Sequence, residues 1–221
     1  MLKIIGEGKY GIAYLAQGID LKKYVLKQLK NEILEATRKK LFYEEEILKK
    51  LKDNRFPKFI EKFDHESNLI YVLEYIEGKD FEDILNEDEY EFSKEEIYNI
   101  AIQLIDIVEI LQKNNIIHRD LRTPNIILDK NNKLKLIDFG LARYIDDKKY
   151  VKEIDYWYIA DFLVHLYYSS CYKESNLGER PWFEELDLNE KECLFLKKLM
   201  GIEGFYKSID EIKKNFKDVI N

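Results

Sequence analysis

Hydrophobic and polar positions divide the chain into an N-terminal part with strand-like segments and a longer part with helical periodicity. In the first part, short β-rich segments are bounded by Gly, Asp or Asn, as is typical of strands. These predicted strands are Leu2–Ile5, Ile12–Gln17, Tyr24–Leu29 and Leu69–Glu74. One helix is predicted among them, from about Asn31 to Lys52.

The remainder of the chain has the pattern of capped helices. Ser93 and Glu96 have the spacing of a capping box, in which side chain and backbone at a helix start bond each other. An apolar stripe follows at helical spacing: Ile97, Ala101, Leu104, Val108 and Leu111. Two further helix starts are predicted, one after Asn189 (about Glu190–Met200) and one at Ser208 with Glu211.

The most apolar stretch, Tyr156–Tyr172, predicts a buried core helix. Asp161 and His165 interrupt it, and it is shorter than the roughly 20 residues that a membrane span needs. We therefore expect no membrane span. Between the two parts, Glu74–Gly78 runs from an apolar strand end into a glycine and is a plausible hinge. The pattern predicts an α+β fold with a β-rich lobe and a mainly helical lobe.

Composition narrows the classes of function. Hydrophobic residues make up 46% and charged residues 36% of the 221 positions, which indicates a globular protein. The net charge of −7 disfavours general nucleic-acid binding. Cys171 and Cys193 show no C-x-x-C spacing, so we expect reduced thiols in a cytoplasmic protein. A recognisable element already begins at residue 4, and we expect no signal peptide.

One stretch carries the most chemical information. It reads His118-Arg119-Asp120-Leu-Arg-Thr-Pro-Asn125, and Asp138-Phe139-Gly140 begins at the thirteenth position after Asn125. Two acidic groups and an amide at these separations suit binding of a nucleotide's metal and acceptance of a proton from a hydroxyl. Oxygen ligands of this kind are those that magnesium prefers.

Glycines near the N-terminus have the G-x-G-x-x-G form, with Gly6, Gly8 and Gly11. Dinucleotide-binding folds share this pattern, and an ordinary hairpin can also show it. In the dinucleotide fold the glycines open a helix, whereas here a strand-like run follows Gly11. A glycine loop between two strands can fold over phosphates, because backbone N–H groups approach without Cβ obstruction.

Lys27 lies on the next predicted strand and would need a carboxylate to hold it. The helix predicted after it offers Glu44, Glu45 and Glu46. On a helical wheel, Glu44 falls in the middle of the apolar arc, Glu45 at its edge and Glu46 outside it. A carboxylate in an apolar stripe is costly unless it is paired. We therefore predict that Glu44 pairs with Lys27.

Together these motifs resemble the eukaryotic-like (Hanks-type) protein kinases, whose signature is H-R-D-L-x-x-x-N followed by D-F-G. The resemblance implies a bilobal protein-kinase-like fold, with an N-terminal lobe of residues 1–74 and a C-terminal lobe of 75–221. ATP and Mg2+ are implied as cofactors, with a protein as the substrate. Asp120 would act as catalytic base, and Asn125 and Asp138 would hold magnesium.

The same resemblance assigns the remaining site residues. Lys27, held by Glu44, would contact the α- and β-phosphates, and Arg122 would reach the γ-phosphate. An adenine pocket is implied, formed by Ala13, Val25, Leu73, Glu74, Ile76, Ile127 and Ile137. Leu73 has the gatekeeper position, and Glu74 and Ile76 would offer backbone groups to adenine. Phe63 is expected to complete a hydrophobic stack through Leu48, Phe139 and His118.

The chain departs from the family after Gly140. Fourteen residues separate Gly140 from Asp155, and no A-P-E motif occurs, as in small bacterial variants with a shortened activation segment. Asp155 would brace the backbone of the catalytic loop, with Asp161 as a second candidate. Because the segment that docks a peptide is reduced, substrate recognition must differ from that of the family.

The shortened segment contains no Ser or Thr between Asp138 and Tyr168. Arg119, which in many kinases pairs with a phosphorylated activation loop, therefore has no Ser/Thr partner there. We expect activity without Ser/Thr phosphorylation of this segment, with Asp146, Asp147 or a tyrosine supplying any anion.

Three readings remain open. The first is an ATP- and Mg-dependent kinase that phosphorylates Ser/Thr of a protein, although Arg122 in place of the usual lysine leaves the preference between Ser/Thr and Tyr open. The second is a small-molecule kinase of the same fold, which the reduced docking segment would suit. The third is a pseudokinase that binds partners without catalysis. The sequence does not indicate an oligomeric state.

Overall fold

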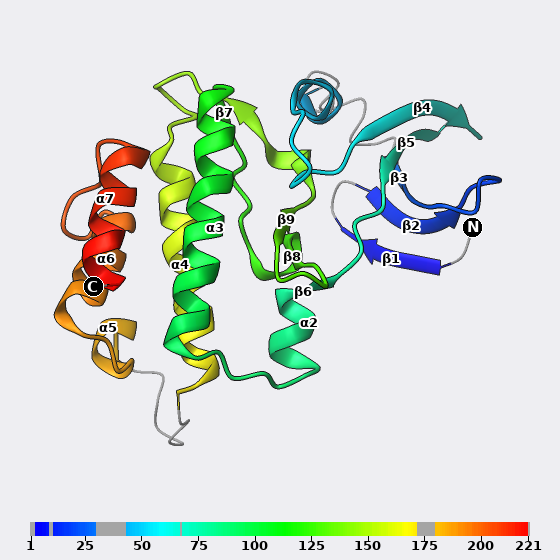
Figure 1. The fold of residues 1–221 in the computed structure, drawn as a ribbon. Helices are drawn as coiled ribbons and strands as arrows, with labels where there is room; N and C mark the ends of the chain where they lie inside the picture. The colour runs from blue at the N-terminus through cyan, green and yellow to red at the C-terminus, as the bar shows by residue number, and fades with distance from the viewer. Residues whose placement is uncertain (1–2, 9–10, 30–42, 67, 172–179, 221) are drawn as a thin grey trace. The chain divides into compact units, whose positions relative to one another are not determined.

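A computed structural model of the protein describes residues 3–8, 11–29, 43–66, 68–171 and 180–220 (Figure 1). Contacts divide the chain into two compact units. The first unit comprises Met1–Glu77 and Lys135–Ala142, and the second comprises Gly78–Leu134 and Arg143–Asn221. The short stretch that contains Asp138 thus belongs to the first unit, although the helices before and after it belong to the second.

The first unit is built on a five-stranded antiparallel sheet in the order β1-β2-β3-β5-β4. Its strands are β1 (Lys3–Glu7), β2 (Gly11–Gln17), β3 (Lys23–Leu29), β4 (Phe59–His65) and β5 (Asn68–Glu74). A helix at 43–50 belongs to the same unit. Four strands and this helix confirm the sequence pattern, while the predicted helical residues 31–42 lie outside the described part.

Strand β4 was not among the predicted strands, and its surroundings explain why. From Ile60 to His65 every residue is exposed, so no alternation of apolar and polar positions marks this edge strand. Phe63 is 40% exposed, and its register opposite Ile70 places it on the sheet face away from Lys27. Its predicted place in a hydrophobic stack is therefore wrong. Phe139 instead packs edge-on against buried Phe56, with ring centroids 5.6 Å apart.

The second unit is mainly helical. Its longer helices are α3 (Lys94–Lys113), α4 (Glu153–Ser169), α6 (Glu190–Leu199) and α7 (Ile209–Ile220), with the short α2 (Phe81–Asn86) and α5 (Trp182–Glu185). Helix α3 packs against α4 and α7, and α6 packs against α4 and α7 (Figure 1). Short strands β6 (Lys79–Asp80) and β8 (Ile126–Leu128) pair antiparallel, as do β7 (Ile116–Ile117) and β10 (Arg143–Tyr144).

Helix starts in the second unit follow the predicted caps. Ser93 accepts a hydrogen bond from the Glu96 amide, and the Glu96 carboxylate accepts from the Ser93 amide, which is the predicted capping box. The stripe from Ile97 to Leu111 is buried. Asn189 caps α6 in the same reciprocal way, and Ser208 accepts from the Glu211 amide at the start of α7. Local backbone demands therefore fix where these helices begin.

Helix α4 is the core helix predicted for the most apolar stretch. Its buried residues lie on nearly all sides, from Asp155 and Tyr156 to Leu166 and Tyr167. A helix that is apolar all round is stable only when other elements surround it. None of the helices within the described residues combines the length and the apolar character that crossing a membrane requires.

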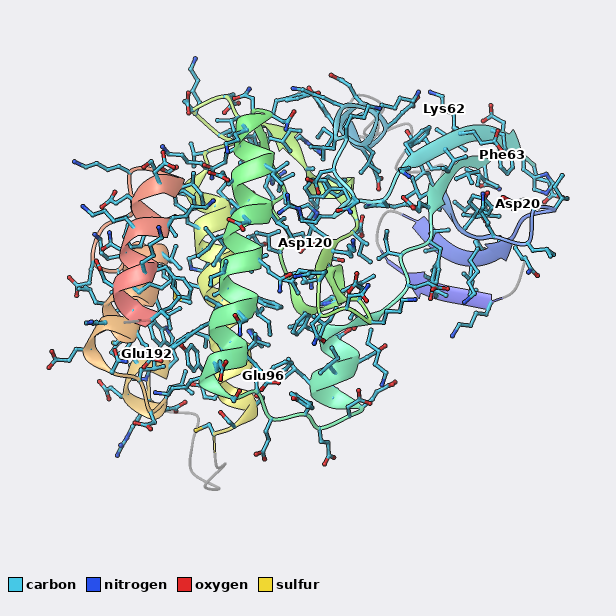
Figure 2. All side chains as sticks on the ribbon, in the orientation of Figure 1. Asp20, Lys62, Phe63, Glu96, Asp120 and Glu192 are labelled. Carbon is cyan, nitrogen blue, oxygen red and sulfur yellow. The ribbon has the colours of Figure 1, made fainter. Side chains whose placement is uncertain are left out.

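One buried carboxylate ties three of these helices together. Glu192 of α6 is 1% exposed and accepts hydrogen bonds from Tyr98 of α3 (2.7 Å) and Tyr167 of α4 (3.1 Å) (Figure 2). Lys94 Nζ lies 3.2 Å from the same carboxylate. Because a buried charge is tolerated only with such partners, Glu192 fixes how α3, α4 and α6 pack.

Candidate active site

Strand register in the first unit gathers several candidate residues on one face of the sheet. Lys27 of β3 lies opposite Ala13 of β2 and Tyr71 of β5. Two residues earlier, Val25 lies opposite Leu73. Residues directly opposite in antiparallel strands share a face, and so do residues two apart in one strand. Ala13, Val25, Lys27 and Leu73 therefore lie on the same face, with Leu73 fully packed in the core.

Lys27 joins two carboxylates on that face. Its Nζ lies 2.8 Å from Glu44 Oε1 and 2.9 Å from Glu44 Oε2, and 2.7 Å from Asp138 Oδ1. The predicted pairing of Lys27 with Glu44 is confirmed. Glu45 is instead held by Lys49 and Lys62, and Glu46 is exposed, as the helical wheel indicated.

Burial makes this cluster electrostatically strong. The side chain of Glu44 is 1% exposed and that of Lys27 13%, whereas that of Asp138 is 49% exposed. Burial by itself would lower the pKa of Lys27, but the charges of Glu44 and then Asp138 outweigh it and raise that pKa. Burial raises the pKa of Glu44, and the Lys27 ammonium opposes the rise. Lys27 therefore stays a cation at neutral pH.

The backbone around Asp138 is specialised. Asp138 has left-handed backbone angles (φ 57°), and its Oδ1 accepts a hydrogen bond from the Gly140 amide at 3.2 Å. A Cβ at position 140 would lie 3.2 Å from Asp138 Oδ1 and 3.3 Å from Lys27 Nζ. A side chain there would crowd the ion pair, so glycine keeps the Lys27–Asp138 contact open.

The three glycines near the N-terminus play different parts. Gly6 lies in β1 and Gly11 begins β2, two strands that pair antiparallel, and the Gly8 amide donates to the Gly11 carbonyl at 3.0 Å. A Cβ on Gly11 would come within 2.2 Å of the Gln28 carbonyl oxygen, so the fold itself requires glycine there. A Cβ on Gly8 would meet nothing within 4 Å. The fold leaves space at Gly8, which fits a backbone that a phosphate approaches closely.

In the second unit, Asp120 is the centre of a compact hydrogen-bonded group (Figure 2). Its Oδ1 accepts from Arg122 Nε at 2.5 Å, and its Oδ2 accepts from Arg122 Nη2 at 3.2 Å and from Asn125 Nδ2 at 2.8 Å. Asp120 is 8% exposed, whereas the Arg122 side chain is 56% exposed. Asp120 raises the pKa of Arg122 through this bond, so the guanidinium stays charged. The pair fixes the carboxylate in a bidentate fork.

Asn125 has an orientation that its hydrogen bonds decide. Its Nδ2 donates to the Asp120 carbonyl oxygen at 2.9 Å and to the Asp120 carboxylate, both of which can only accept. The amide oxygen is therefore turned away from Asp120. An amide oxygen on Asn125 and a half-exposed carboxylate on Asp138 are hard donors of the kind magnesium takes. The chemistry of each side chain by itself suits this ion, and each residue belongs to a different unit.

Asp155, and not Asp161, braces the loop that carries Asp120, as predicted. Asp155 Oδ2 accepts from the His118 amide and Asp155 Oδ1 from the Arg119 amide, both at 2.8 Å. Asp155 is fully buried, and burial raises its pKa to about 6 against the opposing effect of these two hydrogen bonds. Arg119 adopts a left-handed backbone (φ 70°), a strained conformation that surrounding contacts must hold.

The raised pKa of Asp155 predicts a pH dependence of stability. An unfolded aspartate titrates near pH ~3.9, so the folded protein binds more protons between that value and about 6. The stabilising contribution is complete below pH ~4 and is lost as the pH rises through the folded-state pKa. Relative to Asp155→Asn, the native protein should gain about 1 kcal/mol in free energy of unfolding between pH 7 and pH 5.

Denaturant unfolding of both proteins at the two pH values measures this difference. Asp218→Asn, a substitution at an exposed position of α7, is the matched control and should track the native protein. A pH-independent difference between native protein and Asp155→Asn would show that Asp155 does not titrate in this range.

The residues expected around adenine are divided between the units. Ala13, Val25, Leu73, Glu74, Ile76 and Ile137 belong to the first, and Ile127, which is buried, to the second. The Glu74 amide donates to the Lys58 carbonyl at 2.9 Å. That amide is committed to the fold, and only other backbone groups of this segment can serve a ligand. Whether these residues form a pocket stays a prediction.

Sequence reasoning missed two residues beside the catalytic loop. Arg143 is 5% exposed, and Tyr150 lies with its ring under the Arg119 guanidinium, 4.9 Å from its central carbon. The sequence suggested only that some tyrosine or acid would face Arg119. The usable signal was the lack of Ser and Thr in the segment, which directs attention to its aromatic and charged residues as candidate partners of a loop arginine.

Comparisons with known proteins found related sequences. The model of the protein kinase domain matches residues 1–176. A probable serine/threonine-protein kinase of Bacillus subtilis, YbdM, is 34% identical over 98% of this chain and 87% of its own length. The serine/threonine-protein kinases PKH2 of Saccharomyces cerevisiae (37% identical) and human Nek5 (33%) match 65% and 66% of this chain. The chain spans only 14% and 21% of those two proteins.

Proposed function

This chain belongs to the protein kinase family, and from that premise we propose that it transfers the γ-phosphate of ATP to Ser/Thr hydroxyls of a protein, with magnesium. The observation that carries the proposal is the buried Lys27–Glu44 pair with Asp138 on the same lysine. A purely structural ion pair would not require a third, half-exposed carboxylate. In a site where the lysine binds phosphate and the third carboxylate binds the metal, all three groups have a function.

We assign Lys27 to the α- and β-phosphates. Its ammonium is a point cation whose charge the Glu44 carboxylate secures and orients. Because Glu44 is almost fully buried, the lysine cannot swing away without stranding a charge in the core. Gly8 supports the same role, since its backbone lies open for close approach of phosphate oxygens.

We assign Asp120 to the acceptor hydroxyl. Its carboxylate would accept or orient the proton that leaves the attacking oxygen, and Arg122 and Asn125 hold it in one orientation. Fixing the base in advance removes the entropic cost of aligning it during reaction. Arg122, anchored on Asp120 and more than half exposed, is proposed to offer its outer N–H groups to the γ-phosphate.

Asn125 and Asp138 would hold magnesium through their side-chain oxygens. The ion would neutralise the charge that develops between the β- and γ-phosphates. Asp138 Oδ1 also lies 2.7 Å from Lys27 Nζ, so the lysine and the ion would share this carboxylate. Gly140 keeps that carboxylate accessible, and the Gly140 amide orients it.

The names of the related proteins support serine and threonine as acceptors. YbdM and the yeast and human relatives are all described as serine/threonine-protein kinases. The match to YbdM covers 98% of this chain, so it includes residues beyond the matched kinase model, which ends at residue 176. We propose a protein substrate on this basis and keep a small-molecule acceptor as an outcome of the test.

Incubation of the purified protein with labelled ATP and magnesium, with and without a generic protein acceptor, tests the proposal. Label should enter protein on Ser or Thr, and chelation of magnesium should abolish it. Asp138→Ala should lower transfer by about 10³-fold or more, because the magnesium ion then lacks a ligand and can no longer neutralise the charge of the phosphates. Asp64→Ala, at an exposed position of β4, is the matched control and should transfer normally.

The outcomes separate the competing functions. Turnover only with a small hydroxylated acceptor would replace the proposal with a small-molecule kinase. Nucleotide binding with no transfer to any acceptor would indicate a pseudokinase. Transfer that survives Asp138→Ala would refute the metal assignment.

A further inference from the structure

The segment after β10 is fastened to the strand that leads into the catalytic loop. Arg143 of β10 pairs with Ile117 of β7, the residue before His118. The Ile145 amide then donates to the Asn115 carbonyl at 2.9 Å, and the Asn115 side chain donates to the Ile145 carbonyl at 3.3 Å. Residues 143–145 therefore keep a fixed register against the catalytic loop, and they lie in the same unit.

The next five residues close on themselves. Asp146 Oδ1 accepts from the amides of Lys148 (3.0 Å), Lys149 (2.9 Å) and Tyr150 (2.8 Å), and the Asp146 amide donates to the Tyr150 carbonyl at 3.1 Å. Asp146 therefore uses its carboxylate to hold its own loop. The expectation that Asp146 supplies the anion for Arg119 finds no support here, and the closed loop fixes the position of Tyr150 instead.

Three cations surround the Tyr150 side chain. The central carbon of the Arg119 guanidinium lies 4.9 Å from the ring centroid, and Lys149 Nζ lies 5.4 Å from it. Arg143, which is buried, hydrogen-bonds the Tyr150 side chain. Burial opposes ionisation, but Lys149 and the two arginines together lower the pKa of Tyr150. An electron-rich ring among these charges attracts each of them.

Arg119 needs such contacts because its backbone is strained. Its left-handed conformation persists only where the surroundings hold it. Asp155 holds the Arg119 amide, and Tyr150 holds the guanidinium at the other end of the residue. Arg119 directly precedes Asp120. The backbone conformation of Arg119 therefore determines where the Asp120 side chain lies.

We propose that unphosphorylated Tyr150 is a positioning residue, which stacks on Arg119 and thereby holds the catalytic loop with Asp120 in its working conformation. The proposal rests on the function proposed above in so far as Asp120 is the base. This role of Tyr150 explains how a shortened segment without Ser or Thr can support an active site. The aromatic ring contacts the Arg119 guanidinium, so a phosphorylated residue is not required there.

Substitutions that separate the ring from the hydroxyl test this proposal. Tyr150→Phe keeps the ring and cannot be phosphorylated, and its kcat should stay within about threefold of the native value. Tyr150→Ala removes the ring and should lower kcat about tenfold, the equivalent of about 1.4 kcal/mol, with KM for ATP unchanged. Tyr90→Ala, which removes an exposed tyrosine of the same unit, is the matched control and should leave kcat unchanged.

A double-mutant cycle shows whether Tyr150 acts through Arg119. Arg119→Ala alone should lower kcat to a similar degree, and adding Tyr150→Ala to it should cause no further loss. Losses that multiply would overturn the proposal. So would Tyr150→Phe being as impaired as Tyr150→Ala, or active protein carrying phosphate on Tyr150 by mass spectrometry, since the hydroxyl would then be the functional group.

Hydrogen exchange gives a readout that does not depend on catalysis. The amides of His118 and Arg119 are bonded to Asp155, and in Tyr150→Ala they should exchange about tenfold faster than in the native protein. Tyr90→Ala should leave their exchange unchanged. Unchanged exchange in Tyr150→Ala would overturn the proposal. If the native protein transferred no phosphate, the proposed function would fail, while this measurement would still decide the role of Tyr150.

Discussion

Asp120→Asn is expected to lower kcat by about 10²–10⁴-fold, the range that a positioned general base contributes. The amide retains the size of the carboxylate and one of its two oxygens, but it cannot accept the proton of an attacking hydroxyl. KM for ATP should stay within about twofold, because Lys27, which we assign to the α- and β-phosphates, lies on β3, and the remaining side-chain oxygen of the asparagine can still accept a hydrogen bond from Arg122. This split distinguishes loss of the chemical step from loss of binding.

The surroundings of Asp120 also predict a cost in stability. Both carboxylate oxygens accept from donors, Oδ1 from Arg122 and Oδ2 from Arg122 and Asn125. An amide offers one oxygen, so its NH2 group must face another donor at either Arg122 or Asn125. We expect a loss of about 1–3 kcal/mol in the free energy of unfolding, as for other unsatisfied buried polar groups.

Steady-state kinetics and denaturant unfolding of the same preparations separate these two effects. Asp129→Asn is a suitable control, because Asp129 Oδ1 accepts from the amides of Asn131 and Lys133 in a turn, and an asparagine oxygen can do the same. This variant should match the native protein in both measurements. An Asp120→Asn protein that keeps more than about a tenth of the native kcat would rule out Asp120 as the base.

Positions where one local rule decides the structure were predictable from the sequence. Glu44 could be chosen among three adjacent glutamates because only a paired carboxylate is tolerated within an apolar arc. Ser93 and Asn189 indicated helix starts, because their side-chain oxygens accept hydrogen bonds from backbone amides that have no partner within the first turn of a helix. Asp155 could be assigned only through the resemblance, and its two bonds to the loop amides bear out that assignment.

Features that depend on distant packing were not predictable in the same way. Strand β4 has no alternation because its residues beyond Phe59 are exposed, so pairing with β5 alone defines it. Phe56 rather than Phe63 packs against Phe139, because the chain before β4 brings Phe56 there. Asp146 closes a five-residue loop that ends in Tyr150, and the sequence does not reveal that this loop brings the ring to Arg119.

Lys27→Met is expected to lower kcat/KM by at least about 10²-fold and to destabilise the first unit by about 3–5 kcal/mol, the cost of breaking a buried ion pair. Without the ammonium, Glu44 stays in the core with no cation from Lys27, beside the further negative charge of Asp138. Its pKa should rise further, so the stability of the variant should improve as the pH falls. Denaturant unfolding at several pH values measures this trend.

A compensating substitution separates stability from function. Lys27→Met combined with Glu44→Leu replaces the buried pair by apolar side chains, a change that is often neutral or stabilising. The double variant should therefore recover most of the lost stability and still transfer no phosphate, because the point cation for the phosphates is missing. Asp138 tolerates the change, since its carboxylate is half exposed and can be solvated.

Lys49→Met provides the matched control, since it makes the same substitution at the surface. Lys49 pairs with Glu45 four residues earlier, its side chain is 56% exposed, and Lys62 still holds Glu45 when Lys49 is lost. Such exposed pairs contribute about 0.3–0.5 kcal/mol, so stability and activity should change little. A double variant at positions 27 and 44 that regained activity together with stability would show that the pair is structural, and the assignment of Lys27 to the phosphates would fail.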